Sequence, residues 1–326
     1  MDRRTAVVGL AAASLAGAGV TRAQVTGVRR IAWVSVDRPS PDEPSIANFR
    51  RGLRELDRAE GRDLTIDYYG GEGSPERLRQ LVPVVVAKRP DVIVAAGGPV
   101  LQTFIDANVA QPVVFAISGD AVAGKVVSSY ARPGVNRSGI SFFGTQLIPK
   151  RLALLKEIKP SIRRLGIVGW SRHAGEALEV AAATGEAKRL GWAHDYHPVD
   201  SVAQLDEAFA ALARWRPDAV LAFADAISAA NAQRFSAFGE RQRVPCISAW
   251  AIFAQRGNLM TYGPNLEESY ARLATYVDRV LKGGRLADMP VEQPRTIELV
   301  VNRRAAKDLG IALPPALLAR ANQILD

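Results

Sequence analysis

The feature that most constrains this chain is a strand pattern that occurs twice. Residues 89–98 read RPDVIVAAGG, and residues 216–225 read RPDAVLAFAD, 127 positions later. In each copy a short apolar run bounded by turn residues predicts a strand that is buried on both faces. A helical segment and a second apolar run follow each copy, at 113–118 and 244–248. Each half of the chain therefore contains a strand–helix–strand unit, in which we expect parallel strands and a right-handed crossover.

The rest of the chain continues this alternation of strands and helices. Its 326 residues suffice for two lobes with separate cores. The predicted fold class is α/β, with two doubly wound lobes that each have helices on both faces of a parallel sheet. Near the carboxyl end we expect an extended stretch at 294–301, a short helix at 303–309 and a final helix at 317–324. The remaining strands are expected at 31–36, 64–68, 139–143, 164–170, 194–199 and 259–262.

Residues 1–23 have the pattern of an export signal. Arg3 and Arg4 give a positive start, residues 6–20 are small and apolar, and Thr21-Arg22-Ala23 resembles a cleavage site. The alternative is a cytosolic protein with an apolar tail. We expect cleavage near Ala23 and a periplasmic location, reached by the Sec or the twin-arginine route.

Charge and cysteine content exclude several function classes. The formal net charge is +9, and +7 without residues 1–23, which hold three arginines and one aspartate. The basic residues are scattered, so we expect a basic surface and no nucleic-acid partner. Cys246 is the single cysteine, which excludes an internal disulfide. The three histidines are too separated for a metal motif, so neither a metal nor another cofactor is expected.

Six segments, taken in order, resemble the bacterial ABC-transporter substrate-binding proteins whose better-known members bind tryptophan or other aromatic amino acids. They cover nearly all of the chain after the export signal: 49–69, 91–99, 131–141, 150–160, 259–265 and 276–326. The resemblance implies a type I periplasmic-binding-protein fold, with a three-crossing hinge and a ligand between the lobes. It also implies that the partners are the permease and ATPase subunits of an importer, and we expect a monomer.

The same resemblance sets the predicted domain boundaries. The N-terminal lobe is expected to comprise residues 28–143 and 250–285, and the C-terminal lobe residues 144–249 and 286–326. The crossings are expected near 143–145, 248–251 and 286–290. Several cleft positions depart from the family pattern: Gly98 stands where Thr is frequent, and residues 249–251, Ala-Trp-Ala, stand where an Arg-Glu pair is common. The departures leave the choice of ligand open.

An enzyme needs an activated nucleophile, an acid–base pair, a metal or a cofactor. The sequence has no Walker loop and no complete Gly-x-Gly-x-x-Gly motif, and the proximity of Ser171 and His173 is more typical of a polar loop. We therefore predict binding and no catalysis.

A binding cleft needs polar and aromatic groups at the carboxyl ends of the strands. Gly97 and Gly98 open a helix whose N–H groups suit a carboxylate, and Asp120 or Asp225 suits an ammonium. Each feature has a structural alternative, namely a tight turn, capping, or core packing of the aromatic rings. The predicted ligand-binding residues are Ser35, Gly97, Gly98, Ser118, Asp120, Phe143, Trp170, Asp225, Ser248, Trp250 and Tyr262.

The predicted function is the solute-binding component of an ABC importer, which captures an amino acid or another carboxylate-bearing molecule. The alternative is an exported ligand sensor of the same fold that signals to a membrane receptor. A transcription factor would need a DNA-binding helix pair before the first strand, where residues 1–29 have an export-like pattern instead. A purely structural exported protein would leave the polar groups at the strand ends unexplained.

Overall fold

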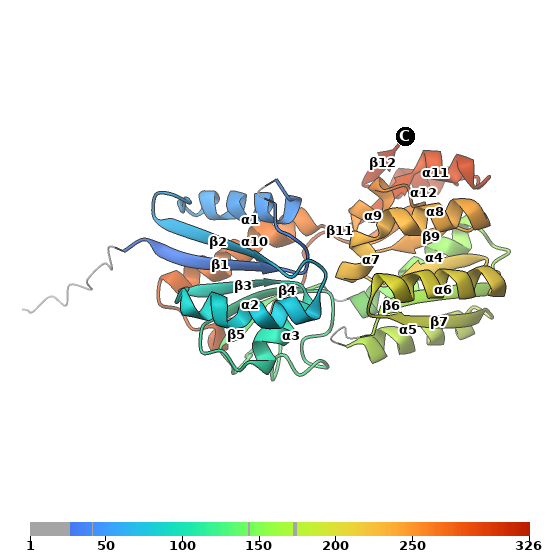
Figure 1. Cartoon of the computed structure of the whole chain (residues 1–326). Coiled ribbons are helices and arrows are strands. Elements are labelled where there is room, and N and C mark those ends of the chain that lie inside the picture. Colours follow the sequence, from blue (N-terminus) through green and yellow to red (C-terminus); the bar gives the residue numbers. More distant parts are fainter. Residues whose placement is uncertain (1–26, 41, 143, 172–174) are drawn as a thin grey trace, which may run out of the picture.

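Two α/β lobes form the protein (Figure 1). The computed structural model describes residues 27–40, 42–142, 144–171 and 175–326. The predicted export signal, residues 1–23, and the predicted ligand residue Phe143 lie outside the described residues. One sheet has five strands in the order β2-β1-β3-β4-β5, and the other has seven in the order β12-β11-β10-β9-β8-β6-β7. The prediction of two separate doubly wound lobes is confirmed.

The described elements divide between the lobes as follows. The first lobe contains β1 (Arg29–Ser35), α1 (Pro44–Glu55), β2 (Leu64–Gly70), α2 (Pro75–Ala87), β3 (Val92–Ala96), α3 (Gly98–Asp106), β4 (Val113–Ile117), β5 (Arg137–Ser141), α10 (Leu266–Leu281) and the short 3-10 helix η1 (Leu286–Asp288). The second lobe contains α4 (Gly144–Ile158), β6 (Arg164–Trp170), α5 (Glu176–Arg189), β7 (Ala193–Val199), α6 (Val202–Trp215), β8 (Ala219–Ala222), α7 (Ala226–Ala230), α8 (Ala232–Gln242), β9 (Cys246–Ser248), α9 (Ala251–Gln255), β10 (Met260–Pro264), β11 (Ile297–Asn302), α11 (Arg303–Asp308), α12 (Pro315–Arg320) and β12 (Gln323–Leu325).

Alternation along the strands explains why each sheet carries helices on both faces. On β1, Ile31 and Trp33 pack in the core beneath α1 and α10, whereas Ala32 and Val34 pack in the core beneath α2 and α3. All four side chains are buried, because successive residues of a strand point to opposite faces. The second sheet is arranged likewise, with α4 and α5 over one core and α6, α8 and α9 over the other.

The repeated Arg-Pro-Asp has one structural role in both lobes. Arg89 and Arg216 adopt left-handed backbone conformations, with φ of 49° and 58°, just after α2 and α6. The Asp then accepts a backbone hydrogen bond at the start of the neighbouring strand. Asp91 accepts from Arg30 N at 2.8 Å, and Asp218 accepts from Arg164 N at 2.9 Å. The repeat thus ends a helix and fixes the register of the next strand.

The described elements place three crossings between the lobes, and two of them differ from the predicted positions. The first crossing joins β5 to α4. The second lies at Asn265 because β10, which we placed in the first lobe, pairs with β9 and β11 of the second sheet. The third follows residue 293, since Glu292 N still donates to Gly139 O of β5 at 2.9 Å. The boundaries predicted at 250 and 286 are therefore wrong.

The predicted helix at 317–324 is only partly correct. Helix α12 ends at Arg320, and the last residues form β12, which pairs with β11 in parallel. Asn322 fixes this pairing: its N–H donates to Leu299 O at 2.8 Å, and its side-chain oxygen accepts from Leu299 N at 2.8 Å. Pairing with the edge strand β11 therefore makes residues 323–325 a strand, although their sequence pattern favours a helix.

Candidate functional site

A cavity of about 820 Å³ lies between the lobes and is lined by residues of both. On the first lobe its lining follows the carboxyl ends of β1, β3 and β4, which is where open parallel sheets bind ligands. Seven of the predicted ligand residues line it: Ser35, Gly97, Gly98, Ser118, Trp170, Asp225 and Trp250.

The start of α3 forms part of the first-lobe wall. Gly97 has φ of 118° and ψ of 151°, a conformation that disfavours any residue with a Cβ. Its N–H donates to Ala116 O at 3.0 Å and is therefore engaged within the sheet. The N–H groups of the first helical turn have no acceptor inside a helix, and Pro99 has no N–H at all. A ligand acceptor at this wall would meet the Gly98 N–H and the positive end of the α3 dipole.

Aromatic rings form a second part of the wall. Phe142 lies edge-on to Trp250, with 6.2 Å between ring centroids, and to Tyr270, with 6.3 Å between centroids. All three residues line the cavity, and they come from the end of β5, the start of α9 and helix α10. Burial, together with the nearby charge of Glu43, raises the pKa of the Tyr270 hydroxyl well above its usual range, so it is a hydrogen-bond donor at neutral pH. This wall suits a flat apolar group.

Trp170 and Asp225 face the cavity from the second lobe. Asp225 accepts from Ser228 N at 2.7 Å, from Ser228 Oγ at 3.1 Å and from Trp170 N at 3.2 Å. Its carboxylate thus caps α7, which is the structural alternative to an ammonium contact. Trp170 is 4% exposed, and its indole Nε1 has no hydrogen-bond partner among the described residues. A buried N–H without an acceptor is unfavourable, so a ligand acceptor at this position would be stabilising.

Three predicted residues do not line the cavity. Asp120 accepts from the N–H groups of Val122 and Ala123, both at 2.9 Å, and from the Tyr130 hydroxyl, so it stabilises its own loop. Ser248 is buried at the end of β9. Tyr262 packs against the core of the second lobe.

The sequence analysis missed most of the lining, including the acidic residues Asp37 and Glu43 and the aromatic residues Phe142 and Tyr270. Asp37 and Glu43 lie in the loop between β1 and α1, and burial raises the pKa of both carboxyls. The position after a strand end was a usable signal for Asp37. The sequence has no comparable signal for Tyr270. This residue lies on α10, which packs on the first lobe although the preceding strand, β10, belongs to the second sheet.

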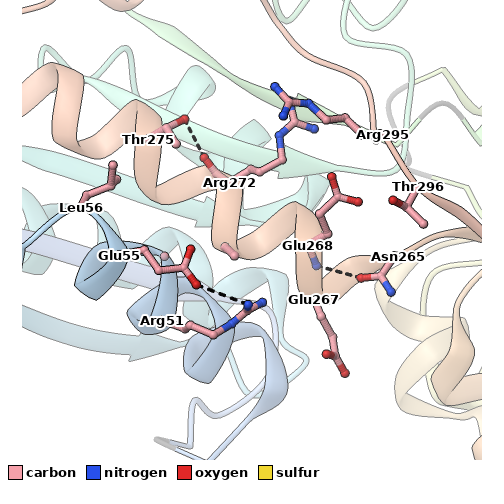
Figure 2. A pocket seen from close by; sticks show the side chains of 12 residues that line it. Arg51, Glu55, Leu56, Asn265, Glu267, Glu268, Arg272, Thr275, Arg295 and Thr296 are labelled. Carbon is pink, nitrogen blue, oxygen red and sulfur yellow. Dashed lines mark hydrogen bonds and ion pairs between the residues drawn. The ribbon is translucent and has the colours of Figure 1, made fainter.

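A second hollow, of about 480 Å³, lies between α1, α10 and the third crossing (Figure 2). Figure 2 shows the side chains of Arg272 and Arg295 next to each other, while Arg51 pairs with Glu55 along α1. Its described lining holds three arginines and three glutamates and no aromatic side chain. These charges balance and give no basis for selecting an organic solute, so we place the ligand site in the interlobe cavity.

Over the described ranges, no helix is both long enough and apolar enough to span a membrane. The same ranges contain no cluster of three or more His, Cys, Asp or Glu residues arranged to hold a metal ion.

Comparisons with known proteins agree with this architecture. A protein from Vibrio cholerae O1 biovar El Tor, known as a conserved domain protein, has a solved structure with 26% identity and a TM-score of 0.84 over 91% of this chain and 99% of its own. The ABC domain from Streptococcus pneumonia, solved in complex with L-Trp, has 22% identity and a TM-score of 0.84 over 92% of this chain and 100% of its own. The tyrosine-binding protein of Clostridioides difficile (strain R20291) is 21% identical over 85% of this chain and 79% of its own.

Two doubly wound lobes with a cavity between them have the type I periplasmic-binding-protein fold. The family model for ABC transporter substrate binding proteins matches residues 32–325. The chain therefore belongs to the family of ABC transporter substrate-binding proteins. The family is one of binding proteins, in agreement with the prediction that the chain is not an enzyme.

Proposed function

We propose that this protein captures an amino acid with a flat aromatic side chain between its lobes. The observation that carries the proposal is the interlobe cavity of about 820 Å³, whose lining contains both aromatic side chains and the start of helix α3. Gly98 N–H and the α3 dipole would bind the ligand carboxylate, with the Trp170 indole N–H as a further donor. Phe142, Trp250 and Tyr270 would pack against the ring. Support comes from the relatives, one a tyrosine-binding protein and one solved with L-Trp.

The test is a thermal-shift screen of the purified chain against amino acids and aromatic acids. A ligand at 100 times its Kd stabilises the protein by about 2.7 kcal/mol, which is easily measured. We expect tryptophan or tyrosine to raise the Tm. Trp250→Ala should weaken this binding by about tenfold, whereas Trp215→Ala should leave it unchanged, because Trp215 packs under Arg164 away from the cavity. Shifts with sugars or metal ions alone would contradict the proposal.

We further propose that the chain is exported to the periplasm, is cleaved after Ala23 and feeds a permease driven by an ATPase. Support comes from the pattern of residues 1–23 and from the family, whose function is extracytoplasmic. Mass spectrometry of protein from the native host should find an N-terminus at Gln24. An intact Met1–Gln24 segment would contradict export by this route.

A further inference from the structure

The interlobe cavity is acidic, although the protein is basic. The whole chain carries a formal net charge of +9. The cavity lining nevertheless contains five carboxylates and one guanidinium, which belong to Asp37, Glu43, Asp225, Glu267, Glu298 and Arg256. A cavity lined mainly by one sign of charge favours ligand groups of the opposite sign. The lining therefore favours a ligand that carries a positive charge.

The five carboxylates differ in how far the protein already satisfies them. Asp225 caps α7, and Glu298 accepts from Asn265 Nδ2 at 3.0 Å. Glu267 is exposed at the start of α10, where the helix dipole favours a negative charge. These three have structural roles or are exposed, and Asp37 is exposed as well. Glu43 is the half-buried carboxylate that no ion pair satisfies among the described residues, with Asp37 beside it on the same wall.

Glu43 and Asp37 are two carboxylates of like charge that line the cavity from the loop between β1 and α1. Glu43 is half-buried and accepts one hydrogen bond, from Ser45 Oγ at 2.6 Å. Over the described ranges neither carboxylate forms an ion pair with a lysine or arginine. Burial raises the pKa of Glu43, and the charge of Asp37 raises it further. A cation placed between them would relieve both effects, because an opposite charge favours the ionised form.

The surroundings of Glu43 suit an ammonium in particular. Its charge acts on the hydroxyl of Tyr270, and Glu43 lines the same cavity as the aromatic side chains of Phe142, Trp250 and Tyr270. Aromatic faces attract cations as well as apolar groups. On the opposite lobe, Trp170 also lines the cavity, and its Nε1 has no partner among the described residues, so it is available to a ligand with a hydrogen-bond acceptor. A ligand with both groups and a ring is an amino acid and not a simple acid or amine.

We propose that Glu43, assisted by Asp37, binds the ligand ammonium and makes the cavity select aromatic amino acids over the corresponding acids that lack the amine. This inference rests on the proposed function and replaces Asp120 and Asp225 as the candidate ammonium contacts. A deaminated acid, which has no ammonium of its own, would bring its carboxylate into a lining that already holds five carboxylates and one guanidinium. Glu43 is thus a specificity-determining residue.

The test is calorimetric titration of the full chain with two matched pairs of ligands. The pairs are L-tryptophan with 3-indolepropionate and L-tyrosine with 3-(4-hydroxyphenyl)propionate, whose members differ only in the amine. We expect the wild-type protein to bind each amino acid at least ten times more tightly than its partner. Glu43→Gln keeps the shape of the side chain and should weaken amino-acid binding by about 10- to 100-fold. Binding of the acids should stay constant or improve.

Two further variants make the result specific. Asp37→Asn should also reduce the ratio of the affinity for the amino acid to the affinity for the matching acid, but by a smaller factor than Glu43→Gln. Glu267→Gln, which also removes a carboxylate from the lining, should change it by less than about threefold. The Tm of each variant without ligand shows whether it is folded.

The outcomes separate this inference from the proposed function. If Glu43→Gln and Asp37→Asn both leave the amino-acid to acid ratio unchanged while the wild-type protein binds the rings, the ammonium assignment is overturned and the proposed function stands. Equal weakening of both ligand classes would also overturn it, because it would indicate a structural role. If the wild-type protein binds none of the four ligands, both proposals fall.

Discussion

The guanidinium of Arg151 in α4 donates a hydrogen bond of 2.8 Å from Nε to the backbone carbonyl of Tyr262 in β10. Its Nη1 donates to Gly144 O at 3.3 Å. Gly144 follows the first crossing between the lobes, and Tyr262 lies just before the second. One buried side chain therefore ties together the two segments that connect the lobes. Burial lowers the pKa of Arg151 to about 10, which leaves it charged at neutral pH near the carboxyl group of Glu179.

Replacing Arg151 by Met should destabilise the protein strongly. The variant keeps much of the buried volume but leaves the backbone carbonyls of Tyr262 and Gly144 without this donor. Each buried hydrogen-bonding group left unsatisfied costs about 1–3 kcal/mol. Urea unfolding should show this loss in Arg151→Met, with less than about 0.5 kcal/mol in Arg54→Met, which changes an exposed arginine of α1. A loss below about 1 kcal/mol in Arg151→Met would show that Arg151 contributes little to this connection.

Glu179 should make stability fall as pH rises. Burial raises the pKa of Glu179 from 4.5 to about 8. The positive charge of Arg151 lowers this pKa, and the negative charge of Asp225 raises it, but burial has the largest effect. Between these values the folded protein keeps a proton that the unfolded chain has lost, so the free energy of unfolding decreases from about pH 4.5 to about pH 8. Each pKa unit corresponds to about 1.4 kcal/mol.

Glu179→Gln removes this titration and provides the measurement. Its free energy of unfolding relative to wild type should increase steadily between pH 5 and pH 8 and then level off. Glu207→Gln, an exposed change on α6, should give a difference that is flat with pH. A flat difference for Glu179→Gln as well would mean that the carboxyl is ionised at neutral pH in the folded protein.

Gly52 allows the close packing of α1 on α10. A Cβ at Gly52 would lie 2.0 Å from the carbonyl oxygen of Ala271, so one of the helices would have to move. Gly52→Ala should therefore cost about 1–3 kcal/mol in thermal or urea unfolding. Gly185, inside α5, is the matched control, because a Cβ there meets nothing within 4 Å. Gly185→Ala should stabilise the protein by about 0.5–1 kcal/mol. Equal effects at the two positions would contradict this account.

Local patterns were sufficient to predict the lobes. The two Arg-Pro-Asp copies mark equivalent strand starts, and the structure shows why: Asp91 and Asp218 each accept a backbone hydrogen bond from the first strand of their lobe. Because such strands are buried on both faces, nearly all of their residues are apolar, and the sequence shows them as continuous apolar runs. The family resemblance added the order of the crossings but misplaced two of them. The sequence pattern of β10 is compatible with either sheet. In the structure β10 pairs with β9 and β11, which places it in the second sheet.

The cavity was only partly predictable, since a strand end places a residue near the cleft without fixing where its side chain points. Gly97 and Trp170 follow this rule and line the cavity, whereas Asp120 turns into its own loop to bind Val122 N. Glu43 lies eight positions after the end of β1, and Tyr270 lies on a helix that returns from the other lobe. These contributions depend on tertiary contacts, which local periodicity does not encode.

Trp170→Phe should separate ligand binding from stability. The change deletes an indole N–H that has no partner among the described residues, so the free protein should lose little beyond the smaller ring. If that N–H donates to the ligand, affinity for tryptophan or tyrosine should fall by about 2- to 12-fold, the equivalent of about 0.5–1.5 kcal/mol. Trp33→Phe is a matched control, because Trp33 is fully buried with the same partnerless Nε1 but does not line the cavity. Calorimetric titration should show weaker binding in Trp170→Phe alone. Equal affinities in both variants would mean that the Trp170 N–H does not contact the ligand, and the second lobe would then recognise the ligand by shape.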